Sequence, residues 1–65
     1  MLSFDAIDEA RRLLDVRQKA LCRAAGISPA TYTRIKMRKS SPTVRTLGKL
    51  ANGLEVVRSR REAAE

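Results

Sequence analysis

The chain has 65 residues, of which 14 are Lys or Arg, 7 are Asp or Glu and none is His, so its formal net charge is +7. Its one cysteine, Cys22, excludes an intramolecular disulfide, and without histidine the chain has too few ligands for a zinc site of Cys and His. The length suits a single domain, expected over residues 1–65 with a core from about 4 to 57 and a charged tail from 58 to 65.

The first helix is expected from about Phe4 to Leu14, with Ser3 as its N-cap. Acids follow in its first half and two arginines in its last turn, as the helix dipole favours. Apolar residues recur at the i, i+3, i+7 spacing and predict a stripe that faces the core. That stripe consists of Ile7, Ala10 and Leu14, flanked by Phe4 and Leu13.

A second helix is expected from about Gln18 to Ala25, ending at Gly26, a residue suited to the left-handed conformation of a helix C-cap. Its buried stripe is Leu21 and Ala25, with Cys22 as a small neighbour. Cys22 is interpreted as a packing residue, because the chain has no histidine to activate a catalytic thiol.

The third helix opens with Ser28 as N-cap and Pro29 at the first helical position, and continues to about Met37. Tyr32 and Ile35 are three residues apart and are expected to face inward together. The opposite face is small or apolar with one arginine, which is unusual for a solvated helix and favours a surface pressed against a partner. Its residues are Ala30, Thr33, Arg34 and Met37.

A basic loop, 38–42, leads to a fourth helix, expected from about Val44 to Leu54 with Thr43 as N-cap. Its core stripe is predicted to be Val44, Leu47, Leu50, Ala51 and Leu54. Gly53 is expected near the end of this helix. Beyond it, Val56 and Val57 begin either a short last helix or a segment that pairs elsewhere, and the charged tail is expected to fray.

Positive charge is concentrated in the middle of the chain. No Asp or Glu occurs from Val16 to Leu54, a segment that carries nine Lys or Arg residues. A one-sign segment attracts a polyanion, whereas a surface built only for solubility intersperses both signs. Nucleic acid is therefore the favoured partner, and a merely solvated basic surface is the alternative.

Two short helices joined at Gly26–Ser28 have the geometry of a helix-turn-helix, in which the first helix braces the DNA backbone and the second lies in the major groove. The residues here resemble the Cro/repressor (XRE-type) family of bacterial and phage regulators. The resemblance covers Val16 to Leu54, and it is carried by Gln18–Ser28, Thr31–Ile35, Lys39–Pro42 and Thr46–Leu54.

That resemblance implies an all-α fold, a compact bundle of four to five short helices of the lambda-repressor-like type. It also implies a transcriptional regulator, expected to be a repressor, that binds an operator in double-stranded DNA as a homodimer. One recognition helix covers only a few base pairs, so two are expected about 34 Å apart on half-sites one helical turn apart.

The resemblance assigns the DNA-facing residues as well. Pro29, Ala30, Thr33 and Arg34 match positions that face the bases, and Gln18 matches a position that holds a phosphate. Arg34 can donate two parallel hydrogen bonds to guanine O6 and N7, while the methyl groups of Ala30 and Thr33 can pack on thymine methyls. The alternatives for Arg34 are a phosphate contact and an ion pair with an acid of the first helix.

Further phosphate contacts are expected from residues around this helix, with a solvated basic loop as the alternative. They are Arg17, Thr31, Lys36, Arg38, Lys39, Ser40, Ser41 and Arg45. Arg17 stands where the family prefers a Ser or Thr cap, and Lys36 and Arg38 stand where Glu and Gly are common. The tail has two interpretations, a further phosphate-binding arm or a solvated segment. Its arginines are Arg58, Arg60 and Arg61.

The candidate dimer interface is the apolar end beyond the fourth helix, made of Leu54, Val56 and Val57. Val56 has a second interpretation, in which it folds back onto the domain's own core. The small size of the domain also favours a partner subunit, because so short a chain buries little surface by itself.

Other functions have less support. The chain lacks histidine, paired central carboxylates and a glycine-rich phosphate loop, so no enzyme is expected. RNA reading is disfavoured because both aromatics, Phe4 and Tyr32, fall in core stripes. The alternative function is a helical protein-interaction module or antitoxin-like subunit, whose apolar interface would depend little on salt.

We expect no cofactor, metal, small-molecule ligand or membrane partner. No apolar run approaches the roughly 20 residues that span a bilayer, and the N-terminus lacks the basic start of a secretion signal. The expected location is the cytoplasm, in association with the nucleoid.

Overall fold

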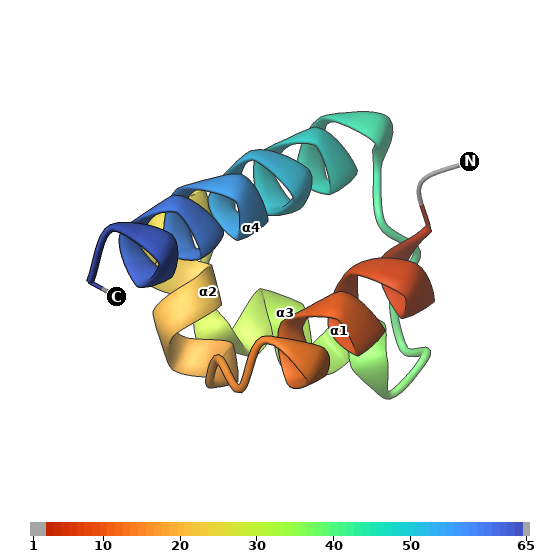
Figure 1. Cartoon of the computed structure of the whole chain (residues 1–65). Coiled ribbons are helices and arrows are strands. Elements are labelled where there is room, and N and C mark those ends of the chain that lie inside the picture. Colours follow the sequence, from red (N-terminus) through yellow and green to blue (C-terminus); the bar gives the residue numbers. More distant parts are fainter. Residues whose placement is uncertain (1–2, 65) are drawn as a thin grey trace.

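The computed structural model describes residues 3–64, with side chains for residues 3–60, and in this part of the chain there are four helices and no strand. The helices are α1 (Phe4–Leu13), α2 (Gln18–Ala25), α3 (Pro29–Lys36) and α4 (Val44–Ala64). Figure 1 shows the long α4 along one side of the molecule and the short helices α1 and α3 on the other. The expected all-α bundle is confirmed. No helix within these residues is long and apolar enough to cross a membrane.

Local hydrogen bonds begin three of the helices at the predicted residues. The Ser3 hydroxyl accepts from the Ala6 N–H at 3.2 Å, and the Ser28 hydroxyl accepts from the Thr31 N–H at 3.2 Å. The Thr43 hydroxyl does the same for the first turn of α4 at 3.0 Å. Such caps satisfy backbone donors that have no partner within the helix, so each boundary is set by adjacent residues.

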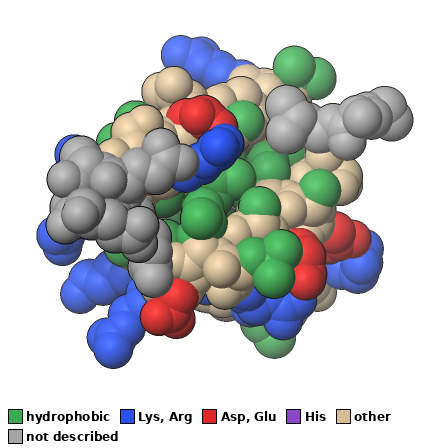
Figure 2. All heavy atoms as spheres, in the orientation of Figure 1, with side chains coloured by type: hydrophobic (Ala, Val, Ile, Leu, Met, Phe, Trp, Pro, Cys, Tyr) green, Lys and Arg blue, Asp and Glu red, His purple; other side chains and the backbone are tan. Residues whose placement is uncertain are grey.

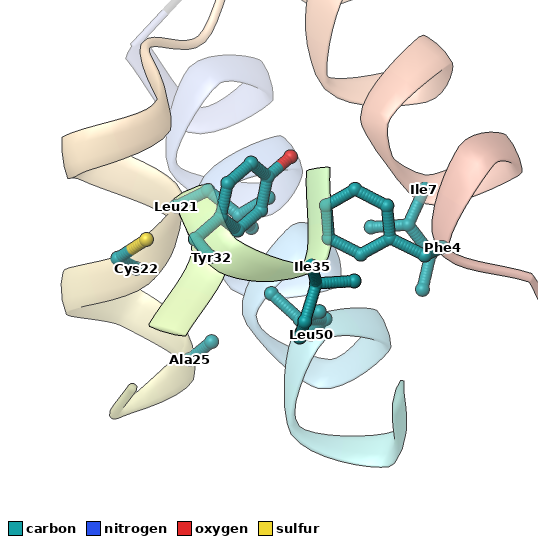
Figure 3. Close-up of a cluster of buried hydrophobic side chains, with 8 residues drawn as sticks. All are labelled: Phe4, Ile7, Leu21, Cys22, Ala25, Tyr32, Ile35 and Leu50. Carbon is teal, nitrogen blue, oxygen red and sulfur yellow. The ribbon is translucent and has the colours of Figure 1, made fainter. Parts of the chain in front are cut away.

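Side chains from all four helices meet in one core (Figure 3). The buried residues are Phe4, Ile7, Leu21, Cys22, Ala25, Tyr32, Ile35 and Leu50. The rings of Phe4 and Tyr32 are 4.9 Å apart between centroids and tilted by 57°, a favourable aromatic arrangement. The predicted burial of both aromatics and of Cys22 is confirmed. Burial raises the pKa of the Cys22 thiol, which disfavours the reactive thiolate.

Two apolar residues that were placed in or beside core stripes are instead exposed. Val44 is 88 % exposed, so its assignment to the core was wrong, and Leu13 is 79 % exposed. Val44 is the first residue of α4, six residues before the helix reaches the buried core at Leu50. Helical periodicity alone cannot show where a stripe runs past the end of the surface it packs on.

The fourth helix does not end near Gly53 as expected, and no separate last helix or pairing segment follows. It continues to Ala64, so Val56 and Val57 lie within it and the backbone of the tail is helical to that residue. Gly53 is buried at the crossing with α2, where a Cβ would lie 2.8 Å from the backbone of Ala25. Glycine permits this close crossing in the interior of α4, whereas the sequence placed Gly53 near the end of the helix.

Candidate nucleic-acid interface

The turn between α2 and α3 is held by backbone geometry. Gly26 has φ of +73°, in the left-handed region that glycine adopts freely. The Ile27 N–H donates to the Cys22 carbonyl at 3.1 Å, which closes the end of α2 as a Schellman motif. Ser28 then caps α3 directly. The chain therefore reverses within three residues and sets two short helices against each other, as in a helix-turn-helix.

The outer face of α3 carries the residues expected to read bases. Ala30, Thr33 and Arg34 are exposed, on the side of the helix opposite the buried Tyr32 and Ile35. This exposed face is therefore small and apolar around one guanidinium. Among the residues with described side chains, Arg34 pairs with no acid, so its fork of donors is available to a ligand.

Pro29 and Thr31 lie beside this face, at the start of α3. Pro29 is exposed at the first helical position. Thr31 is also exposed, but its hydroxyl oxygen lies 2.9 Å from that of Ser28, at hydrogen-bond distance. The Thr31 hydroxyl is therefore already engaged at the cap, where it faces the helix N-terminus rather than the outer face.

Most residues expected to contact phosphates lie at helix starts or in the loop after α3. Arg17 is exposed at the N-cap of α2 and makes no side-chain cap bond, while Gln18 is half-buried as its first residue. Arg45 is exposed in the first turn of α4, after a loop whose exposed members include Lys39. An open cleft of about 180 Å³ brings loop residues together with the start of α1, and its lining includes Arg38, Ser40, Ser41 and Asp5.

Two of the expected phosphate contacts already face acids of α1. The Lys36 ammonium lies 3.9 Å from one carboxylate oxygen of Asp8, and the Arg38 guanidinium lies 3.5 Å from Asp5. One alternative predicted for Arg34 was an ion pair with an acid of the first helix. In the structure, Lys36 and Arg38 make such ion pairs instead. A phosphate that binds Lys36 or Arg38 must therefore either displace the carboxylate of the same chain or share the cation with it.

Arg38 also occupies an unusual backbone conformation. Its φ is +60°, and the Lys39 N–H donates to the Arg34 carbonyl at 2.9 Å, so the end of α3 has the geometry of a Schellman motif. This is the position where the resemblance expects glycine. A side chain in the left-handed region costs roughly 1–2 kcal/mol, so this departure from the family pattern has a structural cost.

Two polar residues of α1 are buried, although the sequence pattern did not predict a role for them. Asp8 and Arg11 are each 7 % exposed, and two Arg11 nitrogens donate to Asp8 Oδ1 at 3.0 and 3.1 Å. Burial raises the pKa of the Asp8 carboxyl, but hydrogen bonds from Tyr32 and Arg11 outweigh it and hold that pKa below its ordinary value. A signal was present, since Asp8 and Arg11 lie four residues after the core residues Phe4 and Ile7.

Comparison with known protein families agrees with this geometry. The family model described as helix-turn-helix matches residues 7–64, which includes all of α2, α3 and α4. No curated protein and no solved structure matches the chain. The described side chains contain no group of acids and cysteine that could hold a metal ion.

Proposed function

Since the chain belongs to the XRE-type helix-turn-helix family of DNA-binding transcription regulators, we propose that it is a repressor that inserts α3 into the major groove of an operator. The observation that carries this proposal is the outer face of α3, where small apolar side chains surround the unpaired Arg34. A protein bound in this way occludes the operator, which is sufficient for repression.

Base reading is assigned to Pro29, Ala30, Thr33 and Arg34. Arg34 donates to guanine O6 and N7, an interaction that discriminates against other bases by about 1–3 kcal/mol. Ala30 and Thr33 present methyl groups to thymine, and Pro29 packs at the groove edge. With one strong donor per subunit, the preferred sequence is expected to contain one strongly specified guanine in each half-site.

Phosphate binding is assigned to the surrounding residues, which grip the backbone without reading sequence. They are Arg17, Gln18, Thr31, Lys36, Arg38, Lys39, Ser40, Ser41 and Arg45. Because Lys36 and Arg38 face Asp8 and Asp5, their gain from DNA is smaller than that of Lys39 or Arg45. Arg58 and Arg60 extend the basic surface along α4, while the side chain of Arg61 lies outside the described residues.

The proposed repressor binds as a homodimer. Leu54 lines an apolar groove of about 270 Å³ with Ala10, Leu13 and Leu14, and the Leu13 side chain in its wall is largely exposed. Figure 2 shows hydrophobic side chains gathered between α1 and α4 on this face, with charged ones toward its edges. Val56 and Val57, two and three residues after Leu54 on α4, are half-buried.

The proposed occupant of this groove is a second copy of the chain. Glu55 and Arg58 border the groove and form an ion pair at 3.4 Å, so this edge carries both signs. A copy with net charge +7 meets less repulsion at such an edge than on the basic side, to which DNA or an acidic protein is drawn.

The test is selection of bound duplexes from a random DNA library at two salt concentrations, with wild type and Arg34→Ala. The expected result is a palindromic motif that loses its preference at one position per half-site in the variant. Arg23→Ala is the matched control, because it removes the same side chain from an exposed site on α2 to which no DNA contact is assigned. Bound DNA without any motif would contradict the proposal, and absence of binding at both salts would point to a protein partner instead.

A further inference from the structure

Two side chains of α3 are buried and pack against the other helices in the core. They are Tyr32 and Ile35, the two buried residues of the helix. Ile35 contributes packing alone, and Figure 3 shows it beside Phe4 of α1. Tyr32 contributes packing through its ring and, at its far end, a hydroxyl group. The orientation of α3 about its own axis therefore depends heavily on one residue.

The Tyr32 hydroxyl belongs to a buried hydrogen-bond network that also includes Asp8, Arg11 and the Val16 carbonyl. It donates to Asp8 Oδ1 at 2.5 Å and accepts from Arg11 Nε at 3.3 Å, both on α1. Arg11 also donates to the Val16 carbonyl at 2.8 Å, in the connection between α1 and α2. Within the described residues, no buried side-chain nitrogen or oxygen lacks a partner. The network thus joins α3 to α1 and to the start of the helix-turn-helix.

Packing alone does not explain why polar groups occupy this place. Burying a carboxylate and a guanidinium has a large desolvation cost, and apolar residues of similar volume often stabilise a core as well or better. Hydrogen bonds differ from apolar contacts in being directional. They therefore restrict rotation of a helix that two apolar contacts would leave adjustable.

Small rotations of α3 matter for a base reader. At the outer radius of a helix with side chains, about 5–6 Å, a rotation of about 10° displaces a side-chain atom by about 1 Å. Binding constellations need to be held within about 0.5 Å of their productive geometry. Arg34 lies on the outer face of α3, two residues after Tyr32, so the network acts on the same helix turn that carries the base-reading guanidinium.

We propose that Asp8, Arg11 and Tyr32 are positioning residues for sequence recognition, holding α3 at the rotation that lets Arg34 reach its base. Lys36 is the other α3 side chain held at this carboxylate, at 3.9 Å, and it steadies the flank of the helix beside α1. This inference rests on the proposed DNA-binding function. It adds that discrimination between sequences depends on residues that never touch DNA.

The experiment compares Tyr32→Phe with wild type in binding the selected operator and a scrambled duplex of equal length and composition. Tyr32→Phe keeps the ring and removes only the hydroxyl. We expect operator affinity to fall about tenfold or more, while affinity for the scrambled duplex and the salt dependence stay unchanged. Ile35→Val is the control, since it loosens packing on the same helix without removing a hydrogen bond and is expected to preserve the operator-to-scrambled ratio.

A second readout separates positioning from loss of stability. In an Arg34→Ala background, Tyr32→Phe is expected to have little further effect on discrimination, because the side chain being positioned is absent. Equal losses on both duplexes, or an unchanged ratio in Tyr32→Phe, would overturn the positioning role while leaving the proposed function intact. A wild-type protein without sequence preference would overturn both.

Discussion

Gly53 of α4 and Ala25 of α2 meet so closely that a Cβ added to the glycine would lie 2.8 Å from the Cα, Cβ and nitrogen of Ala25. Backbone atoms of a helix cannot move aside as a flexible side chain can. This contact sets the distance between the bracing helix of the helix-turn-helix and the long helix behind it.

Gly53→Ala is therefore expected to destabilise the protein by about 1–3 kcal/mol, as overpacking of a filled core does. Gly48→Ala is the matched control, because nothing lies within 4 Å of its added Cβ in the same helix. That control is expected to stabilise by about 0.5–1 kcal/mol through helix propensity. Urea unfolding measures both, and two changes of the same sign would contradict the assigned crossing.

Arg38 is expected to show opposite effects on stability and on DNA binding. Arg38→Gly relieves the backbone strain at φ +60° and is expected to stabilise by about 1 kcal/mol. The lost ion pair with Asp5 offsets little of this, since both side chains are more than three-quarters exposed. If Arg38 binds one phosphate, the log–log salt slope of DNA binding falls by about 0.9.

Arg38→Ala separates the two effects of that substitution. It removes the same guanidinium but keeps a Cβ in the left-handed region, so it is expected to lower the salt slope by the same amount without gaining stability. Thermal unfolding and duplex titration at several salt concentrations provide the comparison. Equal stabilities for the Gly and Ala variants would show that the backbone at this position is unstrained.

The buried Asp8 carboxyl is expected to make folding sensitive to acid. Its pKa is lower in the folded protein than the ordinary value of 3.8, so the unfolded chain binds this proton more readily. The stability it contributes is fully present above about that ordinary value and is lost as the pH falls through the lowered one. Asp8→Asn is expected to be less stable near pH 7 and to approach wild type at low pH. A gap that stays constant over pH 2–6 in urea titrations would contradict this assignment.

The apolar groove makes a separate prediction about assembly. Leu13→Glu puts a charge beside the groove and is expected to shift the protein to monomer in sedimentation experiments. Val44→Glu is the control, because Val44 is also largely exposed, at 88 % against 79 % for Leu13, but does not line the groove. A wild-type protein that is monomeric on the operator, or a dimer unaffected by Leu13→Glu, would exclude this interface. Either result leaves DNA binding by a single α3 untouched.

The sequence by itself determined the family of the protein and where each of its helices begins. The caps at Ser3, Ser28 and Thr43 and the turn at Gly26 were predictable because their hydrogen bonds join residues at most five apart. The outer face of α3 followed in the same way from its helical spacing. Local bonds and periodicity are encoded in neighbouring residues, so the position of the recognition helix in the chain needed no tertiary information.

The tertiary structure alone decided which surfaces meet. Asp8 and Tyr32 are 24 residues apart, and only the packing of α1 on α3 buries one beside the other. The same packing brings Lys36 and Arg38 to carboxylates of α1, whereas the sequence predicted phosphate contacts, with a solvated basic loop as the alternative. Gly53 was predicted near the end of a helix, but the structure places it in the helix interior, in close contact with α2. Val44 was predicted in the core, but its side chain is exposed. Burial and ion pairing depend on which distant segment packs against a residue, and the neighbouring residues in the sequence do not specify that segment.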